Sequence, residues 1–250
     1  MHFYEWLTLA YLLVFSGLAW KRGLSGRRLR LILGAAAIGI ALLGLRSTLV
    51  GSWLPLAFIP LTYSQTGQFV LPLNLKFQSQ LEAFDRKLVL TLPPPLMFAF
   101  ELAYLFCYPL VPLGLVALYL TGLGTYATEF WNVVLLPAYA CYGTFPFVQT
   151  LPPRAIEGNT PWTPERTRMR RLNLFVLRHA SIQANTFPSG HVAASVAVAL
   201  VLLSHATGVG IVFSVVAAMI AAGAFFGRYH YGVDVIIGAL LPLISFWIFA

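Results

Sequence analysis

Two short segments of the sequence place a histidine beside residues that could handle a phosphate group. The first reads Asn185-Thr186-Phe187-Pro188-Ser189-Gly190-His191 and directly precedes an apolar stretch rich in Ala, Val and Ser. We expect a helix to begin here, and its free N–H groups and the positive end of its dipole favour an anion such as phosphate. Gly190 would let the backbone approach that anion closely. The simpler alternative is a turn that ends in an interfacial histidine.

The second segment reads Gly227-Arg228-Tyr229-His230-Tyr231-Gly232-Val233-Asp234 and lies at the border of another apolar stretch. His230 and Asp234 are four positions apart, which places both on one face of a helix. There the carboxylate can fix the imidazole tautomer and stabilise the charge that a histidine nucleophile or base acquires. An ionisable group at membrane depth costs about 2.5–3.5 kcal/mol, so Asp234 needs a partner or a function. The alternative is a plain interfacial helix cap.

A helical hairpin would bring the two segments together. Residues 192–206 and 211–226 are both apolar, and residues 205–210 between them can form a turn. We therefore predict that His191 and His230 meet at one end of this hairpin.

The composition indicates a membrane protein that forms a single domain over residues 1–250. Hydrophobic residues make up 59% of the chain and charged residues 10%, whereas an average soluble domain carries about 25% charged residues. The net charge of +8 is spread between apolar stretches, which fits membrane lipids or a phosphate substrate better than nucleic acid. With two cysteines and no cluster of carboxylates, we expect no disulfide framework, metal or cofactor.

The apolar stretches predict an all-α, polytopic transmembrane helix bundle of about seven spans, because a span needs about 20 apolar residues and must satisfy its own backbone. Residues 51–66 contain Pro55 and Pro60, so they could form an eighth span, a re-entrant piece or an interfacial segment, and six spans are also conceivable. Residues 67–95 predict an amphipathic surface helix or lid. The expected spans are residues 3–20, 31–50, 96–120, 128–149, 190–206, 209–226 and 231–249.

The basic residues suggest an orientation for this multi-pass protein. Lys21, Arg22, Arg27, Arg28 and Arg30 form the densest short basic segment between spans, which the positive-inside rule places in the cytoplasm. Counting seven spans from a retained first one then puts both histidine segments on the non-cytoplasmic face. The basic loop at 150–188 argues for the inside, but long loops follow the rule less closely and an anionic substrate would account for some of its arginines.

Other charged residues have competing explanations. Glu101 could pair with an arginine, line a cavity, or lie at the membrane interface. Asp85 and Arg86 could gate the site, although a surface ion pair is the commoner role for such neighbours. For Arg166, Arg168, Arg170 and Arg171 we favour a solvated loop that touches lipid head groups.

With both histidine segments in view, the sequence resembles the type 2 phosphatidate phosphatase superfamily of membrane lipid phosphatases and phosphotransferases. The likeness covers about residues 145–250, which we regard as the catalytic half. It rests on Pro188-Ser189-Gly190-His191, on His230-Tyr231-Gly232-Val233-Asp234-Val235, and on the stretch from Phe145-Pro146 to Pro152-Pro153-Arg154. The second motif is also similar to that of sphingolipid head-group synthases.

The resemblance implies a two-histidine mechanism. His230 would attack phosphorus to form a phosphohistidine, Asp234 would hold it, and His191 would protonate the leaving oxygen. Ser189 and the Gly190 N–H would bind phosphate oxygens.

The chain departs from the family pattern where the phosphate-binding basic residues are expected. It has no Lys that is followed, after six intervening residues, by Arg-Pro, and the position six before His230 is Ala224 rather than arginine. Guanidinium groups suit the phosphoryl oxygens because they stay charged and bind bidentately. Arg154 and Arg228 are therefore our candidates for binding the phosphate, with Arg178 as a weaker third.

Together these features predict a metal-independent membrane phosphatase that acts on a lipid or polyprenyl phosphate. Water and a lipid hydroxyl are both open as acceptors, and the second would make the protein a phosphotransferase. A rival of another class is a lipid-binding or transport protein whose histidines form a structural or proton-linked network.

Overall fold

The computed structural model describes residues 1–45, 51–158, 160, 162–165, 167–184 and 187–250, so Asn185 and Thr186 of the first motif and Arg166 lie outside the described residues. All regular secondary structure in these ranges is helical, as the sequence predicts. The helices are α1 (Phe3–Lys21), α2 (Gly26–Gly44), α3 (Pro55–Thr66), α4 (Leu75–Asp85), α5 (Pro94–Leu105), α6 (Leu110–Leu120), the short 3-10 helix η1 (Gly124–Tyr126), α7 (Ala127–Gly143), α8 (Pro153–Ile156), α9 (Arg168–Ala180), α10 (Gly190–His205), α11 (Thr207–Phe226) and α12 (Gly232–Phe249).

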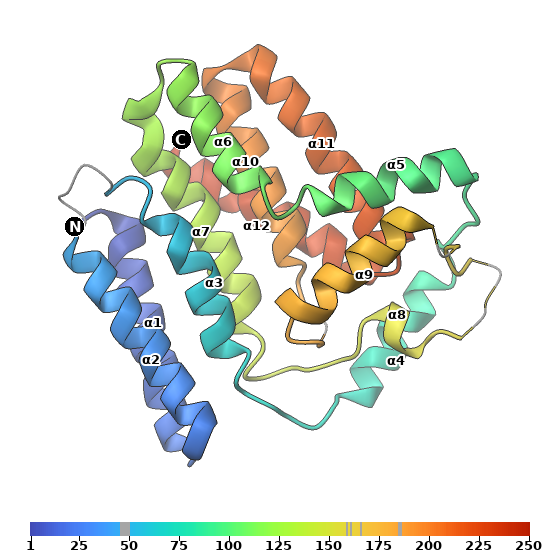
Figure 1. Ribbon diagram of the computed structural model, residues 1–250, viewed down its shortest axis with the longest axis horizontal. Helices are drawn as coiled ribbons and strands as arrows, with labels where there is room; N and C mark the ends of the chain where they lie inside the picture. Colours follow the sequence, from blue (N-terminus) through green and yellow to red (C-terminus); the bar gives the residue numbers. More distant parts are fainter. Residues whose placement is uncertain (46–50, 159, 161, 166, 185–186) are drawn as a thin grey trace.

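Helix α7 forms the centre of the bundle (Figure 1). It contacts α1 and α3 on one side and α10 and α12 on the other. Its inward residues are fully buried, among them Phe130, Trp131, Val134 and Leu135. Helices α10 and α11 pack along each other as the predicted hairpin, and α5 lies against α11. The hairpin is therefore packed against α7 through α10 and against α5 through α11.

Within the part of the chain that the structure describes, three helices, α1, α11 and α12, are long and apolar enough to cross a membrane on their own. Helices α5 and α6 together could form a fourth crossing, but they are bent by 73° at the break between them. The expected span at 96–120 is therefore not one continuous helix. Pro109 lies in the break and Pro112 in the first turn of α6, and proline interrupts helical hydrogen bonding and disfavours helix at the residue before it.

The remaining apolar stretches form shorter helices. Helix α10 is apolar with 16 residues, and α7 has 17 because it ends at Gly143 rather than continuing to residue 149. The uncertain stretch at 51–66 contains α3, which begins at Pro55. Proline is well suited to this first helical position, since its missing N–H has no partner there. Helix α3 has 12 residues and packs beside α2 and α7.

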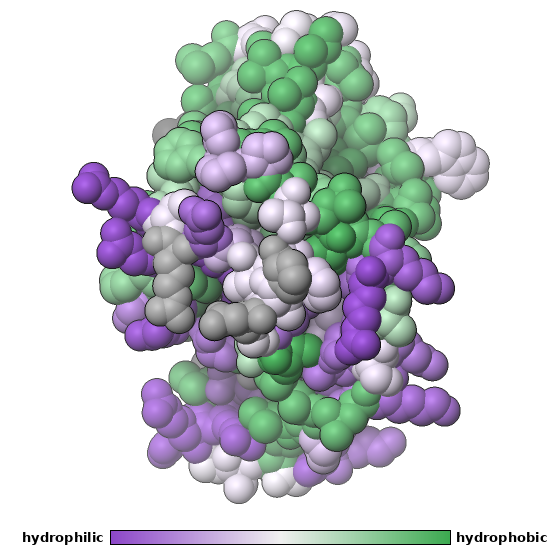
Figure 2. Space-filling view, turned by 90° about the vertical axis from the view of Figure 1, so that its right-hand side faces the viewer, coloured by the Kyte–Doolittle hydropathy of each residue, from purple (hydrophilic) through white to green (hydrophobic). Residues whose placement is uncertain are grey.

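Amphipathic helices lie outside the central bundle. Helix α4 begins after Asn74, whose side chain accepts a hydrogen bond from the Phe77 N–H at 3.0 Å, and it forms the surface helix predicted within 67–95. Helix α9 lies within the segment that we expected to be a loop, and it packs on α5. On the face that Figure 2 shows, hydrophobic side chains gather at the upper end and hydrophilic ones towards the lower end, where Figure 1 places α4 and α8. This separation is compatible with a membrane protein.

The basic segment after α1 lies at the same end of the bundle as the loops that follow α7 and α9. Arg22 donates a hydrogen bond to the Pro146 carbonyl, and its guanidinium lies 5.7 Å from the ring of Phe69, next to the end of α3. The structure therefore brings this segment close to the loop that follows α7, and the membrane face of either segment stays a prediction.

Candidate active site

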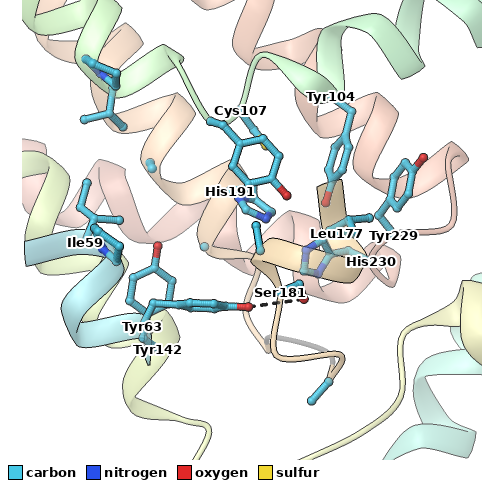
Figure 3. A pocket seen from close by; sticks show the side chains of 18 of the residues that line it. Ile59, Tyr63, Tyr104, Cys107, Tyr142, Leu177, Ser181, His191, Tyr229 and His230 are labelled. Atoms are coloured by element: carbon cyan, nitrogen blue, oxygen red, sulfur yellow. Dashed lines mark hydrogen bonds between the residues drawn. The ribbon is translucent and has the colours of Figure 1, made fainter. Parts of the chain in front are cut away.

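His191 and His230 face each other at the ends of two helices. Ser189 caps α10, so His191 is the second residue of that helix, and His230 lies in the turn between α11 and α12. Their ring centroids are 6.1 Å apart, with the planes at 75° (Figure 3). Both histidines line the same cavity.

Asp234 lies behind His230 in the first turn of α12. Its Oδ2 is 3.5 Å from Nδ1 of His230 and accepts a hydrogen bond from the Tyr231 N–H at 3.0 Å. Asp234 is fully buried and His230 is 5% exposed. A buried carboxylate this close to an imidazole stabilises its charged form and directs the opposite ring nitrogen away from the carboxylate.

The beginning of α10 is attached to the beginning of α12. The Ser189 N–H donates to the Asp234 carbonyl oxygen at 3.0 Å, and the Ser189 hydroxyl accepts weakly from the Val192 N–H at 3.5 Å. Ser189 is fully buried, whereas Gly190 lines the cavity between the histidines. A Cβ at Gly190 would lie 2.7 Å from Cε1 of Tyr142, so this close approach requires glycine.

A cavity of about 430 Å³ extends from the two histidines into the bundle (Figure 3). Tyrosines form much of its wall, and the rings of Tyr104 and Tyr108 lie 5.8 and 5.3 Å from that of His191. The end lined by α3 and α6 is apolar. The lining residues there are Leu56, Ile59, Pro60, Val111 and Pro112.

Arg154 supplies positive charge to this cavity. Among the described residues, it is the one arginine or lysine in the lining. Its backbone N–H donates to the Arg228 carbonyl at 3.0 Å and its guanidinium donates to the Tyr229 carbonyl at 3.1 Å, which fixes it beside His230. Burial lowers the pKa of Arg154, but an arginine remains charged at any physiological pH.

Comparison with known proteins identifies the family of this chain. The profile of the PAP2 superfamily matches residues 69–248, a range that holds both histidine motifs and Arg154. The chain belongs to the PAP2 superfamily. Membership supports a phosphatase-type activity and confirms the resemblance to phosphatidate phosphatases, whereas the likeness to sphingolipid head-group synthases stays a prediction. No curated protein and no solved structure matches the sequence.

Two arginines that we considered for phosphate binding lie elsewhere in this PAP2 superfamily member. The guanidinium of Arg228 is 2% exposed and binds Asp85 at 2.8 Å and Glu157 at 2.9 Å, beside a separate hollow. Burial lowers the pKa of Arg228, but its hydrogen bonds to Glu157 and Asp85 raise the pKa by a larger amount. The net shift in the pKa is therefore upward. Arg178 is exposed on α9 and does not line the histidine cavity. The structure therefore brings neither residue to the two histidines.

Glu101 pairs with an arginine, which was one of its expected roles. Its carboxylate accepts hydrogen bonds from Arg170 at 2.8 Å, Asn173 at 2.7 Å and the Tyr229 hydroxyl at 2.5 Å. Burial and the Glu101 charge raise the pKa of Tyr229, so its proton stays available for this hydrogen bond. The expectation of a solvated side chain at Arg170 is wrong, because it is buried beside Glu101, and this group fastens α9 and α5 to the residue that precedes His230.

The sequence reasoning missed the tyrosines and the role of Asp85. Tyr104 and Tyr108 occur in an apolar stretch, where aromatic residues usually indicate core or membrane interface, but the prolines that follow Tyr108 were a signal of a bend. The expected surface ion pair at Asp85 is wrong: Asp85 is 1% exposed and binds Arg228, while Arg86 pairs with Glu82 at 3.8 Å. Burial raises the pKa of Asp85, and its hydrogen bonds from Gly232 and Arg228 act against that rise.

Proposed function

We propose that this chain is a multi-pass membrane phosphatase that removes phosphate from a lipid or polyprenyl phosphate through a phosphohistidine on His230. The observation that carries the proposal is the facing pair of histidines, 6.1 Å apart at the polar end of a cavity whose other end is apolar. Asp234 behind His230 and Arg154 beside it supply the charges that this chemistry needs. An amphiphilic phosphate would fill both ends of the cavity.

The first step would be attack by His230 on phosphorus. Because Nδ1 lies next to Asp234, Nε2 is the attacking atom, and the P–O bond to the leaving group breaks as the N–P bond forms. His191 donates a proton to the leaving oxygen, which departs as an alcohol. In the second step His191 takes a proton from water, the resulting hydroxide attacks phosphorus, and the N–P bond breaks to release inorganic phosphate.

Arg154 and the beginning of α10 would bind the phosphoryl oxygens. A guanidinium offers two parallel donors, and charge on the oxygens rises in the transition state, so such donors act most strongly there. The Gly190 N–H lies at the start of a 16-residue helix, where the dipole also favours an anion. The proposal gives Arg228 and Arg178 no contact with substrate.

The phosphotransferase alternative differs in the group that attacks the phosphohistidine. A lipid hydroxyl in place of water would move the phosphoryl group to a second lipid, and the apolar end of the cavity favours an acceptor of this kind. The His-Tyr motif followed by Asp-Val points the same way. Product analysis with and without an added lipid alcohol separates the two reactions.

The test is phosphate release from a panel of lipid and polyprenyl phosphates by the purified protein in detergent. His230→Ala and His191→Ala should abolish release, and the trapped phosphohistidine should appear in the wild type but not in His230→Ala. The matched control is His179→Ala, because His179 is exposed on α9 and does not line the cavity. Release that persists in His230→Ala would refute the mechanism, and lipid binding without any release would favour the non-enzymatic rival.

We also propose a membrane face for the site. Since the basic segment after α1 and the loops around the site share one end, the positive-inside rule now favours the cytoplasmic face for both, in place of the non-cytoplasmic face. Ser25→Cys and Thr163→Cys should react with an impermeant maleimide from the same side of sealed vesicles. Labelling from opposite sides would refute this topology.

A further inference from the structure

The main chain that carries His230 is an irregular turn in a costly conformation. Residues 228–231 lie between the end of α11 and the start of α12. Arg228 has a φ of 58°, in the left-handed region that non-glycine residues rarely occupy. Such a conformation persists where surrounding contacts hold it, and it is found frequently at functional sites. The contacts that hold Arg228 therefore matter for the position of His230.

Asp85, at the end of α4, binds the chain on both sides of His230. Its Oδ2 accepts a hydrogen bond from the Arg228 guanidinium at 2.8 Å, and its Oδ1 accepts one from the Gly232 N–H at 2.8 Å. Asp85 and Arg228 are 1% and 2% exposed, so water does not weaken the pair. One carboxylate thus fixes positions two residues before and two residues after the proposed nucleophile.

The same turn also places Arg154. Its backbone N–H donates to the Arg228 carbonyl and its guanidinium to the Tyr229 carbonyl, at 3.0 and 3.1 Å. A shift of the turn would therefore move the nucleophile and the cavity-lining guanidinium together. Glu157, directly after α8, binds the remaining edge of the Arg228 guanidinium, which keeps that side chain pointed away from the cavity.

We propose that Asp85 and Arg228 are positioning residues for the phosphate-transfer reaction, with their buried ion pair holding His230 and Arg154 in register around the phosphoryl group. This inference rests on the proposed function and assigns Arg228 a role other than contact with substrate. A misplacement of about 1 Å at a reacting group costs about 100-fold in rate. The loss should appear in kcat, because neither residue lines the cavity that binds the substrate.

The experiment compares Asp85→Asn, Arg228→Gln and the double variant with a matched surface pair. Each single variant should lower kcat by about 100-fold at unchanged KM, and the double variant should be no worse than the poorer single one, because both changes break the same interaction. Glu82→Gln and Arg86→Gln, which separate a pair at 3.8 Å with Arg86 73% exposed, should keep wild-type kcat. Losses that multiply in the double variant, or a rise in KM alone, would overturn the proposal.

A second variant covers the case in which the neutral substitutions prevent folding. Asp85→Glu keeps the charge but moves the carboxylate outward by one methylene, so the protein should fold with an unchanged Tm and still lose kcat. Arg228→Lys should recover part of the kcat that Arg228→Gln loses, since it keeps a cation for Asp85. Wild-type kcat in Asp85→Glu would contradict a positioning role.

Hydrogen–deuterium exchange separates this inference from the proposed function. Asp85→Asn should speed exchange at residues 228–232 and leave α10 unchanged, whereas Glu82→Gln should alter neither. If the wild type released no phosphate from any substrate, the proposed function would fail, and the exchange data would still decide whether the ion pair anchors the turn. Unchanged exchange at 228–232 would refute the anchoring itself.

Discussion

Replacing Gly238 with alanine should move the beginning of α10, which carries His191, away from α12, which carries Asp234. Gly238 lies on α12 directly against the beginning of α10, and a Cβ there would be 2.7 Å from the Ser189 carbonyl oxygen and 3.3 Å from the Ser189 nitrogen. These are backbone atoms next to Gly190 and His191, so no side-chain rotation can relieve the clash. The beginning of α10 must move away from α12, on which Asp234 orients His230.

The required movement sets the size of the effect. Ordinary contact begins at 3.4 Å, so the helices must separate by about 0.7 Å at this point. Because about 1 Å of misplacement costs about 100-fold in rate, we expect kcat to fall by about 10- to 100-fold. Overpacking should cost about 1–3 kcal/mol in the free energy of unfolding, offset by about 1 kcal/mol from the better helix propensity of alanine.

The assay is phosphate release with a Tm measurement on the same detergent-solubilised sample. Gly17→Ala in α1 is the matched control, because a Cβ there meets nothing within 4 Å and should leave kcat unchanged. If Gly238→Ala kept wild-type kcat, the register of α10 against α12 would not control the chemistry. An equal loss in Gly17→Ala would show a general response to alanine rather than this contact.

The remaining predictions concern the charges around the cavity. Glu101→Gln leaves Arg170 buried without its counter-charge, so the free energy of unfolding should fall by about 3–5 kcal/mol. Thermal unfolding should show a lower Tm, and an unchanged Tm would contradict the buried pairing. Arg154→Gln should reduce kcat by about 100- to 1000-fold with partial recovery in Arg154→Lys, and equal loss in both would argue against a charge effect on the transition state. Because attack needs a neutral His230 and protonation of the leaving oxygen needs a charged His191, the rate should pass through a maximum with pH; a monotonic rate profile from pH 5 to pH 9 would exclude the acid–base assignment.

The parts of the site that could be predicted from the sequence are those encoded within a few residues or a single hairpin. The spacing of His230 and Asp234 is fixed by one helical turn, and α10 and α11 are joined by a turn too short to place them apart. The helical class follows from the composition, because an apolar chain in lipid must satisfy its backbone internally.

The supporting contacts could not be predicted because they join distant parts of the chain. Asp85 and Arg228 are 143 positions apart, and Glu101 and Arg170 are 69 apart. Within its own stretch of sequence, each of these residues resembles an ordinary surface charge. In the folded protein each is buried and paired with a charge from a distant part of the chain. The break between α5 and α6 belongs to the same group, since hydropathy averages over the prolines that cause it.

The basic segment after α1 and the histidine site lie at the same end of the bundle, and this affects the rate at which a substrate arrives. Arg22, Arg27 and Arg28 are exposed at that end, and Arg171 and Arg178 are exposed on α9, whose last turn borders the cavity. Fixed positive charge near a membrane surface raises the local concentration of anionic amphiphiles before any of them enters. Encounter should therefore be fastest at low ionic strength and slow as added salt shortens the Debye length, while turnover of a substrate already in the cavity is unaffected.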